Sequence, residues 1–273
     1  MNKVKSTIFK WKGVLLLALL SAQISSCKKV EFDKGLTQEF SIQSTSNGAT
    51  YKVNVGLPAN YDPNGRYSTI YVLDGEADFA YVANKAKEIS KQKGVLNAIV
   101  VGIGYGNDRS LDYTPTKADE GGGGGKQFME FIENELIPKM EQEYGVEIAR
   151  SGRVILGHSF GGLLSAYAFT NYNSVFGNYI ILSPSIWYDN EVLLQYEQDS
   201  RTANKDQKQL VYMGLGELEN SGRMPAPFEA FYQKLKTNYP NMRLEKKLQP
   251  DLDHVGSKAS NIEAGLEFYF NNR

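Results

Sequence analysis

Residues 154–164 read VILGHSFGGLL, the most informative stretch of the chain for its fold class. Its centre matches G-x-S-x-G, the pattern of a nucleophile elbow, in which a sharp turn between a strand and a helix exposes a serine. The apolar run 154–156 leads into the turn, and a helical pattern over 163–168 leads out of it. Because a bare G-x-S-x-G is common by chance, this context is what predicts a strand–turn–helix with Ser159 at the turn.

The glycines of this stretch fit so tight a turn. Side chains at Gly157 and Gly161 are expected to collide within it, and Gly162 is expected to let the helix begin close to a strand.

The flanking sequence alternates between apolar strand patterns and helical patterns. Such alternation predicts a mostly parallel central sheet with helices on both faces, and together with the elbow it points to an α/β-hydrolase fold. The predicted strands are 39–44 and 51–55 as an antiparallel edge, 69–73, 98–103, 154–157, 179–182, 210–214 and a polar edge strand 242–248. The predicted helices are 79–91, 126–144, 161–171, 228–238 and 260–270, with a long loop before the second and a flexible glycine loop at 121–125.

A serine hydroxyl needs a base to act as a nucleophile, and histidine is the usual one. The chain has two histidines, His158 and His254. The elbow turns the side chain of His158 away from that of Ser159, so His158 is expected to pack or hydrogen-bond beneath the turn. His254 therefore remains as the base, in a loop that follows the last strand, where an open α/β sheet places its active site.

An acid should orient the imidazole and offset its charge. Glu217 and Glu219 both follow the strand 210–214 and both qualify, and Glu219 is preferred because it lies further from the strand end. Asp253 is a weaker rival, since a neighbour of His254 reaches its ring poorly. The order of serine, acid and histidine matches the α/β hydrolases.

The developing oxyanion needs two backbone N–H donors. Phe160, directly after the nucleophile, should supply one. Glu76 should supply the other, because Gly75 lets the chain turn sharply after the strand 69–73.

Five separated motifs resemble the putative-esterase family of α/β hydrolases, which includes siderophore esterases, esterase D-like enzymes and mycolyltransferases. They are YVLDGE (71–76), VVGIGYGNDRSLDYTP (100–115), GHSFGGLLSAYAF (157–169), LSPSIWYDN (182–190) and Asp253-His254. The resemblance covers the chain from about Tyr51 onward. It implies a nucleophile at Ser159, the base at His254 and the oxyanion amide of Glu76. The glutamate acid of the mycolyltransferase branch supports Glu219.

Further residues are expected to line the substrate cleft. Arg109 is positioned to grip an anionic or hydroxyl-rich group, with a loop salt bridge as the alternative. Trp187 follows a strand end, where it would stack on a sugar or catechol ring or else cap the core. The polar stretch 189–208 is expected to form a small lid.

Composition excludes several other classes of function. Two histidines and one cysteine predict no metal site, and nothing calls for a cofactor. A net charge of −1 without a basic stripe argues against nucleic-acid binding.

The N-terminal segment reads as an export signal. Residues 1–27 start with four lysines and an apolar run, and Ile24-Ser25-Ser26-Cys27 resembles a lipoprotein box with Cys27 as the acylated residue. Residues 28–37 then form a tether and 38–273 the catalytic domain. These features predict a cell-envelope lipoprotein, anchored in a membrane through Cys27.

The expected function is hydrolysis of a carboxylic ester through an acyl-enzyme on Ser159, acting on a siderophore-type or acylated-sugar ester. An acyltransferase of the same fold, or a non-catalytic lipoprotein that binds a glycan or siderophore, is the alternative. The sequence leaves the oligomeric state open.

Overall fold

The structure, a computed structural model, describes residues 30–106, 108–119, 121–220 and 222–273. The predicted export signal and Cys27 lie outside these residues. No helix within the described residues is long and apolar enough to cross a lipid bilayer.

An eight-stranded sheet forms the centre of the molecule, in the order β1-β2-β4-β3-β7-β8-β9-β10. Both pairings of β2, with β1 and with β4, are antiparallel, and the other neighbours are parallel, so the predicted antiparallel edge is confirmed. The strands are β1 (Thr37–Gln43), β2 (Thr50–Gly56), β3 (Thr69–Val72), β4 (Ile99–Ile103), β7 (Arg153–His158), β8 (Asn178–Leu182), β9 (Gln209–Gly216) and β10 (Met242–Gln249).

Eight α-helices surround the sheet in the described part of the chain, and they include each predicted one. They are α1 (Gly75–Lys93), α2 (Arg109–Tyr113), α3 (Gly125–Phe131), α4 (Ile137–Glu143), α5 (Phe160–Asn171), α6 (Tyr188–Asn204), α7 (Pro225–Asn238) and α8 (Ser257–Asn272). The π-helical segment Ile132–Leu136 joins α3 to α4, so the predicted helix 126–144 is continuous but irregular.

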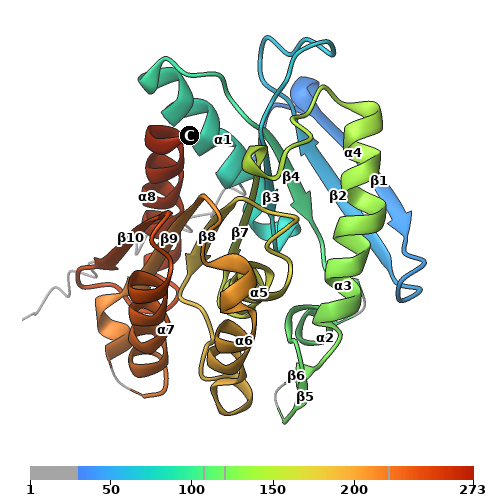
Figure 1. Cartoon of the computed structure of the whole chain (residues 1–273). Coiled ribbons are helices and arrows are strands. Elements are labelled where there is room, and N and C mark those ends of the chain that lie inside the picture. The colour runs from blue at the N-terminus through green and yellow to red at the C-terminus, as the bar shows by residue number, and fades with distance from the viewer. Residues whose placement is uncertain (1–29, 107, 120, 221) are drawn as a thin grey trace, which may run out of the picture.

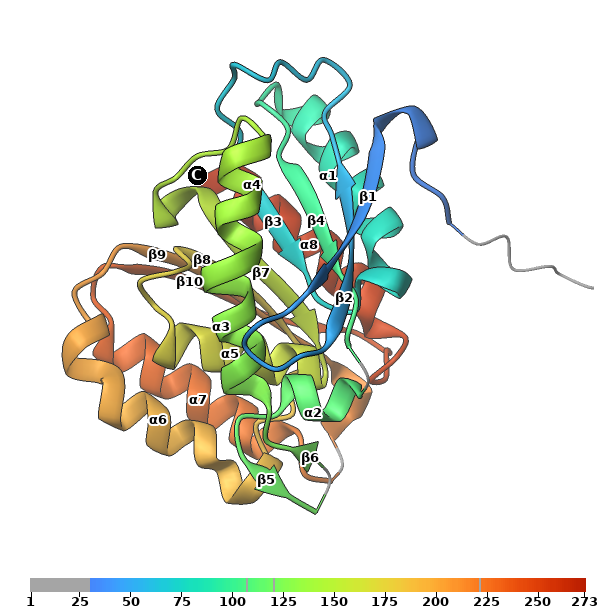
Figure 2. The same ribbon diagram turned by 90° about the vertical axis from the view of Figure 1, so that its right-hand side faces the viewer.

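The helices cover both faces of the sheet, as Figures 1 and 2 show. Helices α1 and α8 pack on one face, and α3 to α7 pack on the other. The central strand β7 serves both layers, because Ile155 faces one core while Val154 and Leu156 face the other. Ile155 lies between Tyr71 of β3 and Tyr179 of β8, which fixes the register at the middle of the sheet.

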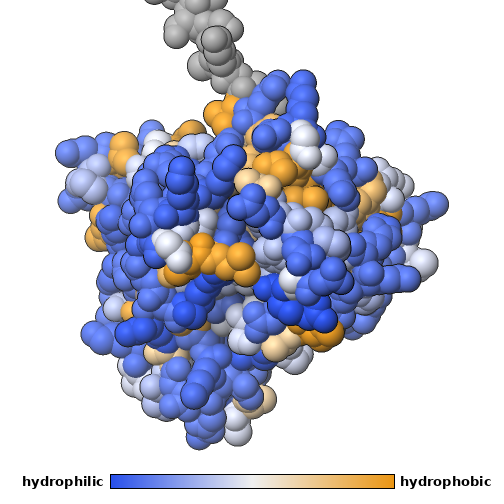
Figure 3. Space-filling model, turned by 90° about the horizontal axis from the view of Figure 1, so that it is seen from above, coloured by the Kyte–Doolittle hydropathy of each residue, from blue (hydrophilic) through white to orange (hydrophobic). Residues whose placement is uncertain are grey.

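The edge of the sheet at which the parallel strands end and the edge at which they begin have different roles. Strands β3, β7, β8, β9 and β10 all end at one edge, which brings together the loops that carry the predicted catalytic residues. Figure 3 looks onto the opposite edge, where the parallel strands begin, and its surface is mostly hydrophilic with isolated hydrophobic groups. An open α/β sheet binds its ligands at the carboxyl ends of the strands.

Two segments in the N-terminal half of the chain differ from the prediction. Phe32, within the expected tether 28–37, is buried and packs edge-on against Phe79, with 6.0 Å between the ring centroids. The reason is that removing an aromatic side chain from water stabilises the folded chain. The expected long loop instead contains α2, which begins where Asp108 accepts the Ser110 N–H, and a two-stranded hairpin. The hairpin pairs β5 (Lys117–Ala118) with β6 (Gly121–Gly122).

Candidate active site

Ser159 stands at the turn between β7 and α5, with φ 62° and ψ −120°. This backbone conformation is rare for a residue with a side chain, and its free-energy cost is of the order of 1–3 kcal/mol. The Ser159 N–H donates to the Leu182 carbonyl at 3.0 Å, which joins the turn to the end of β8. The sequence motif thus forms the strained strand–turn–helix that it predicts.

The glycines of the turn act differently from one another. A Cβ at Gly157 would lie 2.3 Å from the Gly161 carbonyl oxygen, and one at Gly162 would lie 2.6 Å from that of Leu182. Both positions therefore require glycine, as predicted. A Cβ at Gly161 would meet nothing nearer than 3.4 Å, so the predicted collision there is wrong, because a methyl group would only make ordinary van der Waals contacts with Asp74 and Leu73.

His254 and Glu219 are joined by a short hydrogen bond. The imidazole Nδ1–H donates to Glu219 Oε2 at 2.7 Å. The other carboxylate oxygen accepts from the Ser183 hydroxyl at 2.7 Å and from the Gly216 N–H at 2.8 Å. Burial would raise the pKa of Glu219, but the hydrogen bonds from His254, Ser183 and Gly216 hold it below its usual value.

The other two candidate acids have different partners. Glu217 accepts the Asp251 N–H at 3.2 Å, and Asp253 accepts the Gly256 N–H at 2.7 Å. The preferred Glu219 is thus the carboxylate that meets His254. Ser183 has no predicted role, although its place directly after a buried strand marks it as a residue of the functional edge.

His158 connects the elbow to the loop that carries the base. Its Nε2–H donates to the His254 carbonyl at 2.8 Å, and the two imidazole rings lie 4.6 Å apart between centroids. Burial lowers the pKa of His158 to about 4, and the electrostatic effect of the nearby His254 is the second cause. His158 is therefore neutral above that pH and acts as a donor, consistent with its predicted place beneath the turn.

The two predicted oxyanion donors lie at helix N-termini. Phe160 is the first residue of α5 and Glu76 the second of α1, so their N–H groups have no partner within a helix. The left-handed residue before α1 is Asp74, with φ 54°. Gly75 serves a different need from the predicted turn, since a Cβ there would lie 2.5 Å from the β4 backbone at Gly102.

The elbow and the loop of His254 are linked through the neighbour of Ser159. His158 precedes the serine and bonds to the backbone of His254. Among the described residues, no hydrogen bond joins the Ser159 hydroxyl to the His254 ring. Nδ1 of that ring is occupied by Glu219, which leaves Nε2 as the nitrogen that can take a proton.

A family model described as "Putative esterase" matches residues 44–256, most of the chain and all of the site above. The chain belongs to this esterase family. The match spans the elbow, Glu219 and His254, so the family assignment and the geometry concern the same residues.

Named relatives of this esterase-family chain include siderophore esterases. It is 28% identical to the ferri-bacillibactin esterase BesA of Bacillus subtilis over 219 residues, which covers 71% of this chain and 75% of that protein. It is 27% identical to the siderophore triacetylfusarinine C esterase of Aspergillus fumigatus, over 67% of this chain and 68% of the other.

Solved structures share the architecture of this esterase-family chain. The BES protein from Bacillus cereus superposes with a TM-score of 0.77 at 25% identity, covering 88% of this chain and 97% of that one. An IroE-like serine hydrolase from Shewanella oneidensis gives 0.75 at 25% identity, over 86% and 80%. The α/β-hydrolase fold predicted from the sequence is confirmed, and the relatives place the chain among serine carboxylic-ester hydrolases.

Arg109, a predicted substrate contact of the esterase site, forms an ion pair. Its guanidinium donates to both carboxylate oxygens of Asp74, at 2.5 and 2.8 Å, and also to the His158 carbonyl at 3.2 Å. The salt bridge that the sequence left as an alternative is therefore present. Arg109 still lines a cleft of about 390 Å³ together with Glu76, Tyr105 and His158.

Trp187, the other predicted contact, lies beside the elbow. Its ring is 6.1 Å from that of Phe160, and its Nε1–H donates to the Met224 sulfur at 3.0 Å. The stretch after it is not a lid, because residues 188–204 form α6, which packs on α5 through buried side chains such as Leu193.

No group of three potential metal-ligating side chains occurs within the described residues. The chemistry available at the site is that of a hydroxyl, an imidazole, a carboxylate and backbone donors.

Proposed function

We propose that this chain hydrolyses the ester bonds of a siderophore with Ser159, His254 and Glu219 as its triad. The observation that carries the proposal is the 2.7 Å bond from His254 to Glu219, beside an elbow that His158 ties to the same loop. The siderophore esterases among its relatives support the choice of substrate.

The proposed reaction proceeds through an acyl-enzyme. Ser159 Oγ attacks the ester carbonyl carbon while His254 Nε2 accepts the hydroxyl proton. The N–H groups of Glu76 and Phe160 then donate to the oxyanion. The imidazolium, stabilised by ionised Glu219, protonates the departing alcohol as the carbon–oxygen bond breaks. Water adds to the acyl-enzyme by the same route and releases the carboxylic acid and free Ser159.

A substrate panel tests this proposal. Purified protein is incubated with a ferric trilactone siderophore, acetylated and feruloylated sugars, and simple chromogenic esters, and products are identified by mass spectrometry. We expect the siderophore to be cleaved with the highest kcat/KM, and a fluorophosphonate to label Ser159 in the wild type but not in Ser159→Ala. A folded wild type that is neither labelled nor active on any ester would overturn the proposal.

We further propose that the protein is held in the cell envelope by a lipid on Cys27. The support is the sequence pattern of residues 1–27. Cells expressing the full chain and fed an alkyne fatty acid should yield labelled protein in the membrane fraction. Cys27→Ser should lose the label, and an unlabelled wild type in the soluble fraction would contradict the anchor.

A further inference from the structure

Three segments meet at the proposed active site: the oxyanion turn (residues 73–76), the elbow (157–161) and the base loop (251–256). The bond from His158 to the His254 carbonyl joins the elbow to the base loop. The pairing of Arg109 with Asp74 and with the His158 carbonyl joins the oxyanion turn to the elbow. To hold all three segments in place, a further link is needed between the oxyanion turn and the base loop.

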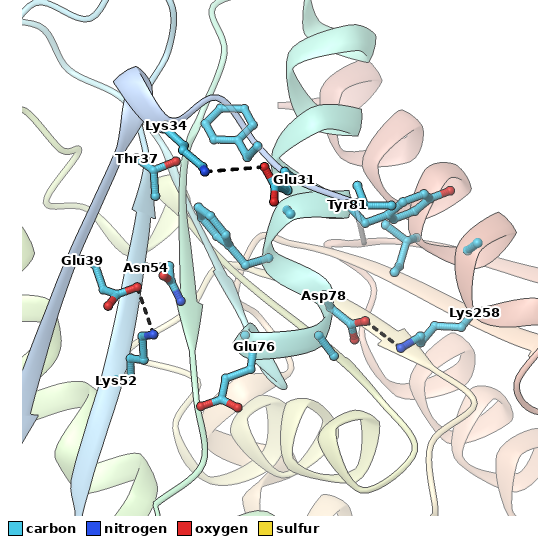
Figure 4. A pocket seen from close by; sticks show the side chains of 18 residues that line it. Glu31, Lys34, Thr37, Glu39, Lys52, Asn54, Glu76, Asp78, Tyr81 and Lys258 are labelled. Atoms are coloured by element: carbon cyan, nitrogen blue, oxygen red, sulfur yellow. Dashed lines mark hydrogen bonds and ion pairs between the residues drawn. The ribbon is translucent and has the colours of Figure 1, made fainter. Parts of the chain in front are cut away.

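Lys258 and Asp78 lie where that link is required. Lys258 Nζ donates to Asp78 Oδ1 at 2.6 Å, across the space between the first turns of α8 and α1, as Figure 4 shows. Asp78 is two residues after Glu76, and its N–H donates to the Asp74 carbonyl. Lys258 is four residues after His254, and its N–H donates to the Val255 carbonyl.

We propose that Asp78 and Lys258 are positioning residues, which hold the oxyanion turn and the base loop at their working separation. The inference rests on the proposed function. Neither residue needs to touch the reacting atoms, because each acts through the first turn of the helix to which its catalytic segment is attached.

Burial makes the loss of this ion pair costly. Asp78 is 6% exposed, so its carboxylate has little water to replace a lost partner. Burial raises the pKa of Asp78, and the hydrogen bond and charge of Lys258 oppose that shift. Lys258 also lines both the cleft over His158 and the larger groove of about 910 Å³ along α1, so the pair stands in the wall between them.

The same two helices provide a matched control. Lys85 of α1 pairs with Glu263 of α8 at 3.1 Å, further along both helices from the active site. The two pairs share the helices and the type of interaction, but the control pair lies further from the catalytic segments and its carboxylate is more exposed. A purely structural role of Asp78 and Lys258 would lower the stability of the fold without a selective loss of kcat.

The experiment compares the two pairs in the full chain. Steady-state hydrolysis of p-nitrophenyl acetate is measured for Lys258→Met, Asp78→Asn and their double variant, beside Lys85→Met and Glu263→Gln. We expect kcat to fall about tenfold in each of the first three, with KM changed less than about twofold, because a small misplacement weakens transition-state contacts. The double variant should resemble the single ones, since one interaction is removed in each.

Further measurements separate positioning from folding. Lys258→Arg keeps the ion pair and should restore kcat, and thermal unfolding identifies any variant that fails to fold. Hydrogen exchange of peptides covering 74–80 and 251–258 should be faster in Lys258→Met than in Lys85→Met. This readout does not depend on turnover, so it decides the positioning role even if the wild type hydrolyses no ester and the proposed function fails.

Two results would overturn the inference. In one, folded Lys258→Met and Asp78→Asn retain wild-type kcat and wild-type exchange. In the other, the control pair lowers kcat and speeds exchange at 74–80 and 251–258 as much as the proposed pair does.

Discussion

At the residue scale, the two carboxylate oxygens of Glu219 accept hydrogen bonds from different partners. One oxygen receives the His254 Nδ1–H, and the other receives the Ser183 hydroxyl and the Gly216 N–H. These donors favour the ionised form, so the carboxylate stays charged when the imidazole becomes cationic. In the proposed reaction, an ionised partner stabilises the imidazolium that forms as the serine attacks.

Glu219→Gln tests the choice between the two glutamates. The amide keeps the shape but loses the charge, so we expect kcat to fall about 10³- to 10⁴-fold. Glu217→Gln is the matched control and should stay within about fivefold of the wild type, because Glu217 meets the Asp251 backbone instead of the base. Equal losses in the two variants would refute the assignment. The measurement is steady-state kinetics on an activated ester.

The lowered pKa of His158 should make the free energy of unfolding depend on pH. Folding lowers its pKa from 6.5 to about 4, so between these values the unfolded chain binds the proton more strongly. The contribution of His158 is complete above pH 6.5 and declines by about 3 kcal/mol as the pH falls to 4. His158→Gln keeps a donor for the His254 carbonyl but cannot titrate.

Urea unfolding of the wild type and His158→Gln between pH 4 and 8 measures this difference. The wild type should lose more unfolding free energy than the variant over the acid half of that range. Parallel curves for the two proteins would show that His158 does not titrate as the structure implies.

At the scale of elements, the junction of β7 and α5 stores the strain that exposes the nucleophile. Gly157→Ala places a methyl group 2.3 Å from the Gly161 carbonyl oxygen, so one element must move. We expect the free energy of unfolding to fall by about 3 kcal/mol. Gly161→Ala is the control, and its unfolding free energy should change by less than about 1 kcal/mol, since the nearest atom is 3.4 Å away. Equal effects in urea titrations would contradict the geometry.

At the scale of the whole molecule, the sheet edge opposite the active site contributes to stability without taking part in the proposed chemistry. Arg150 lies just before β7, away from the site, and donates four hydrogen bonds. Its acceptors are Asn173 and Phe176, which precede β8, and Lys208, which precedes β9. One side chain thus links the segments that lead into three neighbouring strands, β7, β8 and β9.

Arg150→Met should therefore lower stability and spare chemistry. Buried carbonyls lose a charged donor, so we expect the unfolding free energy to fall by about 2–4 kcal/mol. At a temperature where the variant remains folded, kcat should stay within about twofold of the wild type, because the active-site edge is unchanged. Chemical denaturation and ester kinetics on one preparation check both statements. A variant that is stable but slow would refute this division of the molecule.

The sequence alone predicts most of the strands and helices, the elbow at Ser159 and His254 as the candidate base. Those features depend on local periodicity, on a turn that few residues can adopt, and on the scarcity of histidine. Local pattern could not reveal the five-residue helix α2, whose start depends on the side chain of Asp108.

Contacts between side chains on distant segments are seen only in the tertiary structure. It joined Glu219 rather than Glu217 to His254, paired Arg109 with Asp74, and set Lys258 against Asp78, 180 residues away. Sequence position favours Glu219 but cannot show which glutamate meets His254, because that depends on where the folded backbone aims each side chain. The physical reason is that these pairs are created by the return of loops to one sheet edge, which exists once the whole sheet has formed.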